Sequence, residues 1–176
     1  MKKILLMTFA MLIIFTCTTF AAQVQSTVGV VIIGGAEFKT KDYYKMIQSE
    51  IKSKNGAKFQ IGNEIQSKYQ RYLFENDLVG ETTPRKQNLI DFTVRSSCDK
   101  VLFLVVSSTA DHQNNPKSRQ KDRLTVQVDA YLCDKFSVRE VLSSVQENHS
   151  KTSDLRARRG AFRKCLEELA KGLTSL

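Results

Sequence analysis

Two uninterrupted apolar runs constrain the fold of this chain more than any other feature of its sequence. The first run, residues 28–33 (VGVVII), is rich in β-branched side chains and is followed directly by Gly34-Gly35. The second run is residues 101–106 (VLFLVV). Strands without polar alternation are typical of parallel sheets that are covered on both faces. The two runs therefore predict the centre of an α/β domain.

Segments with helical periodicity lie between and after these runs. Pro84 opens the third of them, in which Leu89, Ile90 and Val94 are expected to face inward. The last segment carries an apolar stripe made of Leu155, Phe162, Cys165, Leu166, Leu169 and Leu173. The expected helices span residues 41–54, 64–77, 84–97 and 154–173, and three further strands span residues 58–61, 123–132 and 138–146.

The order of these elements is β-α-β-α-α-β-β-β-α, with no internal repeat. Strands that are joined through helices are expected to be parallel, whereas the last strands, joined by loops, are expected to be antiparallel neighbours. The sequence thus predicts the α/β class, with a mixed five-stranded sheet and helices packed on it. A polar loop is expected at residues 110–122.

The start of the chain has the parts of a secretory signal peptide. Within residues 1–21, two lysines precede an apolar stretch at 4–15, and a small-residue exit follows at 19–21. We expect cleavage before a single α/β domain at 22–176, which is then not transmembrane. Two alternatives stay open: an uncleaved membrane anchor, and a lipoprotein acylated at Cys17.

Three cysteines remain after such a cleavage. If the strands on either side of the polar loop pair so that Thr109 lies opposite Arg123, Cys98 comes close to Cys133. These two are therefore the disulfide candidates in an oxidising compartment. Cys165 lies on the apolar stripe of the last helix and is expected to stay a free thiol.

Four ordered features of the chain resemble one bacterial family. They are the strand that ends in Gly34-Gly35, the segment FQIGNEIQSKYQRYLFENDLVG, the turn and strand SSCDKVLFLVVSST, and the strand pair LTVQVDAYLCDKFSVREVLSSVQ. Together they resemble the envelope domain shared by the curli-secretion lipoprotein CsgG and the amino-terminal part of TolB. Asp99 and Asp134 match the family's motifs in the third and fourth features.

This resemblance implies a sheet of order 2-1-3-4-5 with helices on both faces. It also implies a non-enzymatic protein of the cell envelope, exported to the periplasm or surface of a bacterium. The chain lacks the insertions from which CsgG builds its pore, so we expect no pore. The function predicted is that of an interaction or assembly module, and a homo-oligomer is one form that this could take.

The alternative function is that of a soluble exported binding protein for a small or anionic ligand. Its binding place would be a crevice above Gly34-Gly35, edged by Ser107, Ser108 and Thr109, because ligands favour the point where strand order reverses. No phosphate-loop motif is present, however, and glycines that release the chain from a strand are the simpler interpretation. The ligand-binding residues therefore stay unknown.

Chemistry beyond binding has little support in the sequence. His112 and His149 lie in polar surroundings, and the cysteines are too scattered for zinc, so we expect no catalytic residue, metal or cofactor. The protein is predicted not to be an enzyme.

A basic cluster lies on or beside the last helix of a chain whose net charge is +9. Its members are Lys151, Arg156, Arg158, Arg159, Arg163 and Lys164. It could meet an anionic envelope surface, or it could be a solvated face that only favours solubility. Nucleic acid is not expected as a partner, because aromatic residues do not interleave with the basic ones. The partners predicted are an unknown envelope protein or this anionic surface.

Overall fold

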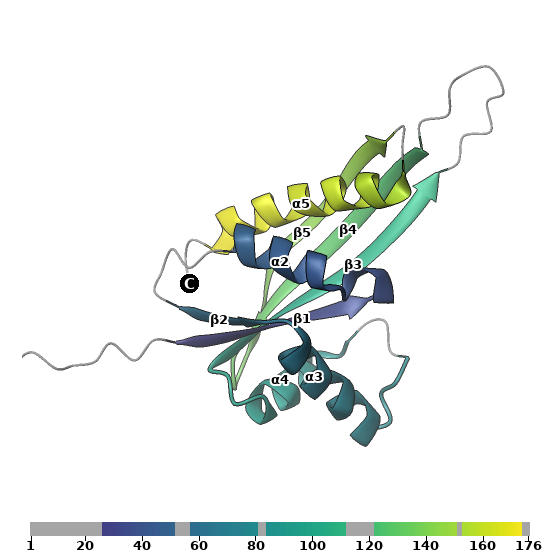
Figure 1. Ribbon diagram of the computed structural model, residues 1–176. Helices are drawn as coiled ribbons and strands as arrows, with labels where there is room; N and C mark the ends of the chain where they lie inside the picture. Colours follow the sequence, from purple (N-terminus) through teal and green to yellow (C-terminus); the bar gives the residue numbers. More distant parts are fainter. Residues whose placement is uncertain (1–25, 52–56, 81–83, 112–121, 151–152, 174–176) are drawn as a thin grey trace, which may run out of the picture.

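A computed structural model describes residues 26–51, 57–80, 84–111, 122–150 and 153–173. The predicted signal peptide with Cys17, and also His112 and Lys151, lie outside these described residues. The described part forms one mixed five-stranded sheet of order β2-β1-β3-β4-β5 with helices on both faces (Figure 1). The predicted class and strand order are therefore confirmed. Within this part, no helix has the length and apolar character needed to cross a membrane.

The elements follow the chain in the predicted order. The strands are β1 (Thr27–Gly34), β2 (Lys58–Ile61), β3 (Lys100–Asp111), β4 (Asp122–Cys133) and β5 (Val138–Ser150). The helices are the 3-10 turn η1 (Ala36–Phe38) and α2 (Lys41–Glu50), α3 (Asn63–Glu75), α4 (Lys86–Arg95) and α5 (Asp154–Gly172). Strand β1 pairs in parallel with β2 and β3, whereas β4 is antiparallel to both β3 and β5, as expected.

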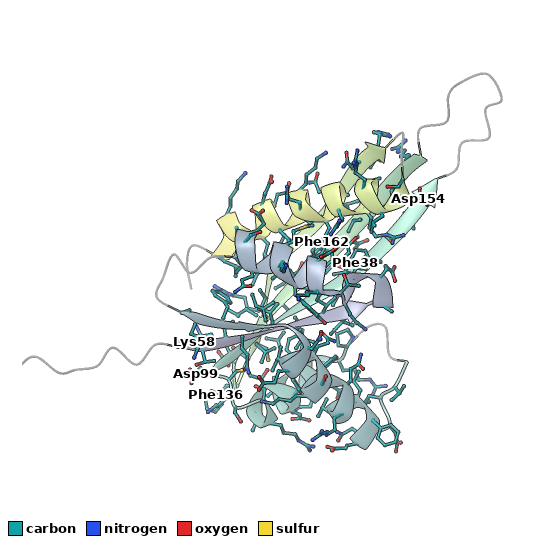
Figure 2. The ribbon with its side chains drawn as sticks, viewed as in Figure 1. Phe38, Lys58, Asp99, Phe136, Asp154 and Phe162 are labelled. Carbon is teal, nitrogen blue, oxygen red and sulfur yellow. The ribbon has the colours of Figure 1, made fainter. Side chains whose placement is uncertain are left out.

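The face of the sheet that α2 and α5 cover holds the larger core. Its centre is an aromatic cluster in which the ring of Tyr43 lies 5.2 Å from the rings of both Phe38 and Phe162. Figure 2 shows Phe38 and Phe162 between the helices and the sheet. All three rings are fully buried, so η1, α2 and α5 are fixed to one another through one apolar contact.

The opposite face is covered by α3 and α4 over the first part of the sheet. The ring of Tyr69 from α3 lies 4.9 Å from Phe92 of α4 and 5.7 Å from Phe103 of β3. Because successive side chains of β1 and β3 point to opposite faces, both helix layers draw apolar residues from the same two strands. This is why the two apolar runs show no alternation.

The register between β3 and β4 differs by two residues from the predicted one. Thr109 lies opposite Thr125, and Val101, three residues beyond Cys98, lies opposite Cys133. A shift of two residues keeps every side chain on the same face of the sheet, so the alternation of apolar residues could not detect it. Strand β3 also continues to Asp111, into the expected polar loop.

The cysteines are affected by this shift. Cys98, Cys133 and Cys165 are all buried free thiols in the structure, so the Cys98–Cys133 bridge is not formed there. The observed register moves Cys133 further along β3 from Cys98 than the predicted register did. Cys165 packs within the buried stripe of α5, where its free thiol was expected.

Two apolar residues expected in the core are exposed instead. Val94 is 56% exposed, because α4 turns its larger apolar residues, Leu89 and Phe92, toward the sheet. Leu155 is 52% exposed, because it lies in the first turn of α5, before Ala157, where burial of the helix begins.

Candidate functional site

A crevice opens where β1 stops and β3 continues. The last paired residue of β1, Gly34, lies opposite Val106, and β3 runs on for five more residues to Asp111. The crevice has a volume of about 880 Å³ and lies at the carboxyl ends of neighbouring parallel strands, the place that the alternative, ligand-binding function would use. It is lined by residues of β1, η1, α3, β3 and the segment after α3: Ile32, Ile33, Gly34, Gly35, Glu37, Lys39, Gln66, Tyr69, Gln70, Leu73, Phe74, Val79, Gly80, Val105, Val106, Ser107 and Ser108.

Gly34 makes this change of direction possible. Its φ of +143° favours glycine, and a Cβ atom at this position would lie 2.1 Å from the carbonyl oxygen of Val106. The next residue, Gly35, accepts a hydrogen bond of 3.2 Å from the Phe38 amide, which closes the turn of η1. Gly34 thus releases the chain from the strand, as the sequence suggested, and in doing so it opens the crevice.

Gln66 closes the base of the crevice beside β1. Its side-chain oxygen accepts a hydrogen bond of 2.9 Å from the Ile32 amide, and its side-chain nitrogen donates one of 3.0 Å to the Ile32 carbonyl. Strand β2 ends at Ile61, which pairs with Val30, so Ile32 has no strand partner on that side. The glutamine takes the place of the missing strand.

Gln66 was not predicted as a functional residue from the sequence. A signal was present, because Gln66 lies between Ile65 and Tyr69 on the side of α3 that should be buried. A buried amide on a helix needs hydrogen-bond partners, but the sequence alone does not tell which strand supplies them.

Polar groups at the mouth of the crevice come from η1 and β3. Glu37 and Lys39 lie on and just after η1, and burial lowers the pKa of Lys39, which the nearby carboxylate of Glu37 partly offsets. Ser107 and Ser108 line the edge of β3 as predicted, whereas Thr109 is not part of the lining. The site therefore offers a few polar anchors on a mostly apolar wall.

The apolar wall extends beyond the crevice to the molecular surface. Phe74 is 76% exposed and Val79 is 71% exposed, and both line the crevice at the end of α3 and in the segment after it. Large apolar side chains that share an exposed patch next to a concavity are typical of a surface that binds another molecule.

The remaining predicted residues do not contribute to this crevice. His149 is exposed on β5, opposite Arg123 of β4. Among the described residues, no three His, Cys, Asp or Glu side chains converge in a way that could hold a metal ion. The three thiols are buried, and burial raises the pKa of each, so the neutral form is favoured.

The basic cluster of α5 is partly paired. Arg159 forms an ion pair with Asp42 of α2, and Arg163 lies 3.6 Å from Glu50. The guanidinium of Arg158 lies 6.0 Å from the centre of the Phe38 ring. The cluster is therefore not one uniform solvated face, because some of its cations belong to the contact between α5 and α2.

Comparison with known proteins identifies the fold only. No family model and no curated protein matches the chain. Among solved structures, the hypothetical protein CT253 from Chlamydia trachomatis is similar, with a TM-score of 0.50 and 8% identity over 86% of this chain and 99% of that one.

Two further structures are more distant in shape. A PelC dodecamer from Paraburkholderia phytofirmans has a TM-score of 0.45 and 12% identity, over 83% of this chain and 88% of that one. Lipoprotein GNA1162 from Neisseria meningitidis has a TM-score of 0.42 and 16% identity, over 79% of this chain and 96% of that one. Only the likeness to CT253 supports a shared fold, and at 8% identity it does not show a shared function.

Proposed function

We propose that this chain is an exported, non-enzymatic protein of the bacterial cell envelope that acts as an interaction module. The crevice at the ends of β1 and β3 is its binding surface, and an apolar segment of a partner protein is the occupant. The observation that carries this proposal is the continuity between the crevice and the exposed side chains of Phe74 and Val79.

The shape of the apolar surface favours a protein segment as the occupant. A small ligand enclosed in the crevice would be in contact with the inner wall near Tyr69 and Val105. Phe74 and Val79 also line the crevice, but such a ligand would leave much of their exposed apolar surface in water, where that surface contributes nothing to binding. A chain that enters the crevice and continues over its rim covers both parts.

The polar groups of the crevice suit such a segment. Strand β3 has no β1 partner beyond Val106, and Ser107 and Ser108 lie along this open stretch. An extended peptide can bind there through backbone hydrogen bonds while its apolar side chains occupy the crevice. Recognition of this kind needs no reactive group.

A second candidate function is the binding of a small molecule. The volume of about 880 Å³ lies within the range of ordinary ligand sites, and the wall is mostly apolar with a few polar anchors. We also propose, from the sequence resemblance alone, that the chain is related to CsgG and to the amino-terminal part of TolB, which would agree with an envelope role.

Native mass spectrometry of the exported protein distinguishes these functions. We expect a partner chain, or a second copy of this chain, to be retained by the wild type and lost in Phe74→Asp. Phe136→Asp serves as the matched control. Phe136 is 90% exposed and lies in the turn between β4 and β5, at the other end of the sheet from the crevice (Figure 2). A co-purified small molecule that Phe74→Asp retains would contradict the proposal.

A further inference from the structure

A second hollow, separate from the crevice, lies between α2 and α5 at the far end of β5. Its volume is about 700 Å³. Four of its lining side chains are cationic, Lys45, Arg156, Arg159 and Arg163, and one is a carboxylate, Asp42, which leaves a net charge of +3. Such a concentration of one sign in a concave site attracts anions.

The cations come from two helices, so they surround the hollow. Lys45 lies on α2, whereas the three arginines lie on α5 at intervals of three and four residues and therefore share one side of that helix. Asp42 pairs with Arg159, and Glu50 pairs with Arg163 from outside the lining. Neither Lys45 nor Arg156 forms an ion pair with another described residue.

This arrangement opposes the stability of α5. Like charges at these intervals repel each other, and Arg156 is only the third residue of a helix whose amino-terminal end favours negative charge. Ser153 caps the amino-terminal end of α5, because its hydroxyl oxygen accepts a hydrogen bond of 3.3 Å from the backbone amide of Arg156. The cap does not neutralise the positive charge of the Arg156 side chain. An anion bound among the arginines would relieve both unfavourable effects.

A glycine inside α5 opens the same hollow. Gly160 lines it, and a Cβ atom there would lie 1.8 Å from the side-chain nitrogen of Asn148 on β5. Glycine weakens a helix interior, so its presence in α5 calls for a local reason. The reason in this structure is the space that it leaves for Asn148, an amide that also lines the hollow and can donate to an anion.

We propose that this hollow is a binding site for a phosphate-type oxyanion, held by Arg156, Arg163 and Lys45 with the Asn148 amide as a further donor. Guanidinium groups bind such oxygens through paired, charge-assisted hydrogen bonds. The anion could be free inorganic phosphate or the phosphate of a lipid headgroup, since the two share this chemistry.

Titration with inorganic phosphate at constant ionic strength tests the site. We expect a saturable rise of the melting temperature of the exported protein, because a ligand that binds only the folded state stabilises it. In Arg156→Gln/Arg163→Gln, the Kd for phosphate should rise by about tenfold or more. Lys45→Gln, which leaves α5 unchanged, should raise it in the same direction.

The matched control removes the same charge elsewhere. Arg71→Gln/Lys86→Gln changes two exposed cations, on α3 and α4, which cover the other face of the sheet. Its Kd for phosphate should equal that of the wild type. The absence of a saturable shift, or equal Kd values in the two double variants, would overturn the proposed site.

Vesicles distinguish the two sources of the anion. If the source is a headgroup, the protein should sediment with phosphatidylglycerol vesicles and not with phosphatidylcholine vesicles, and Arg156→Gln/Arg163→Gln should lose this binding. If the source is free phosphate, phosphate should bind while neither vesicle does. Vesicle binding that the α5 double variant retains in full would show a general charge effect and contradict the site.

Discussion

The side chain of Gln66 binds both backbone polar groups of Ile32. The two hydrogen bonds, of 2.9 and 3.0 Å, connect α3 to β1 at the point where β2 has ended and the crevice begins. Both residues are buried, so water cannot replace either bond. Strand β2 is too short to pair with Ile32, and the Gln66 side chain supplies the hydrogen bonds that the buried backbone N–H and C=O groups of Ile32 would otherwise lack.

Gln66→Met tests this relationship, because methionine has a similar shape and cannot form either bond. Two buried backbone groups would lose their partner, and each such loss costs about 1–3 kcal/mol, so we expect the free energy of unfolding to fall by about 2–6 kcal/mol in urea melts. Gln70→Met, one turn later and exposed, should stay within about 0.5 kcal/mol of the wild type. Equal stabilities of the two variants would show that the Ile32 bonds contribute little.

Gly34→Ala should destabilise the protein more than Gly62→Ala. Both glycines have positive φ values, +143° and +126°, so both variants introduce backbone strain of about 1–3 kcal/mol. Only at Gly34 would the added carbon meet a backbone atom, the Val106 oxygen, whereas nothing lies within 4 Å at Gly62. We expect the two unfolding free energies to differ by about 2 kcal/mol or more. Similar values would mean that β1 and β3 can separate at little cost.

Phe162→Ala should cost about 3–5 kcal/mol in unfolding free energy. The ring is fully buried against Phe38 and Tyr43, so its removal leaves a cavity between α5 and α2. Arg156→Ala, on the exposed side of the same helix, should change stability by no more than about 0.5 kcal/mol. Urea melts of the two variants decide this, and equal losses would be inconsistent with the position of α5.

All three described cysteines should resist alkylation in the folded protein. Burial raises the pKa of each thiol, which keeps the reactive thiolate scarce, and it also excludes the reagent. In urea without reductant, peptide mapping should find Cys98, Cys133 and Cys165 all labelled. A linked Cys98–Cys133 peptide from protein isolated from its native host would instead show that the chain adopts the bridge that the sequence suggested.

Much of the fold could be predicted because it depends on local patterns. The apolar runs and the helical stripes fixed the class, the element order and the parallel and antiparallel pairs. The β3–β4 register could not be predicted, because a shift of two residues leaves the alternation unchanged. Val94 shows a related limit, since a helix rotates to bury its largest side chains, here Phe92.

The sites were predictable only in outline. The Gly34-Gly35 ending located the crevice, but Gln66 and Phe74 come from α3, and their positions depend on how that helix packs. The basic residues of α5 were visible as a cluster. Lys45 and the paired carboxylate of Asp42 lie more than a hundred residues earlier in the chain, and only the fold brings them to the same hollow.

Site-specific photo-crosslinking in the native host is the sharpest test of the proposed binding of a partner protein at the crevice. A photoreactive residue placed at Phe74 lies on the proposed contact surface, whereas Phe136, which is the same residue type and even more exposed, lies away from the crevice. We expect a discrete crosslinked protein species from position 74 and none of that mass from position 136. No crosslink from position 74, or the same species from both positions, would contradict it.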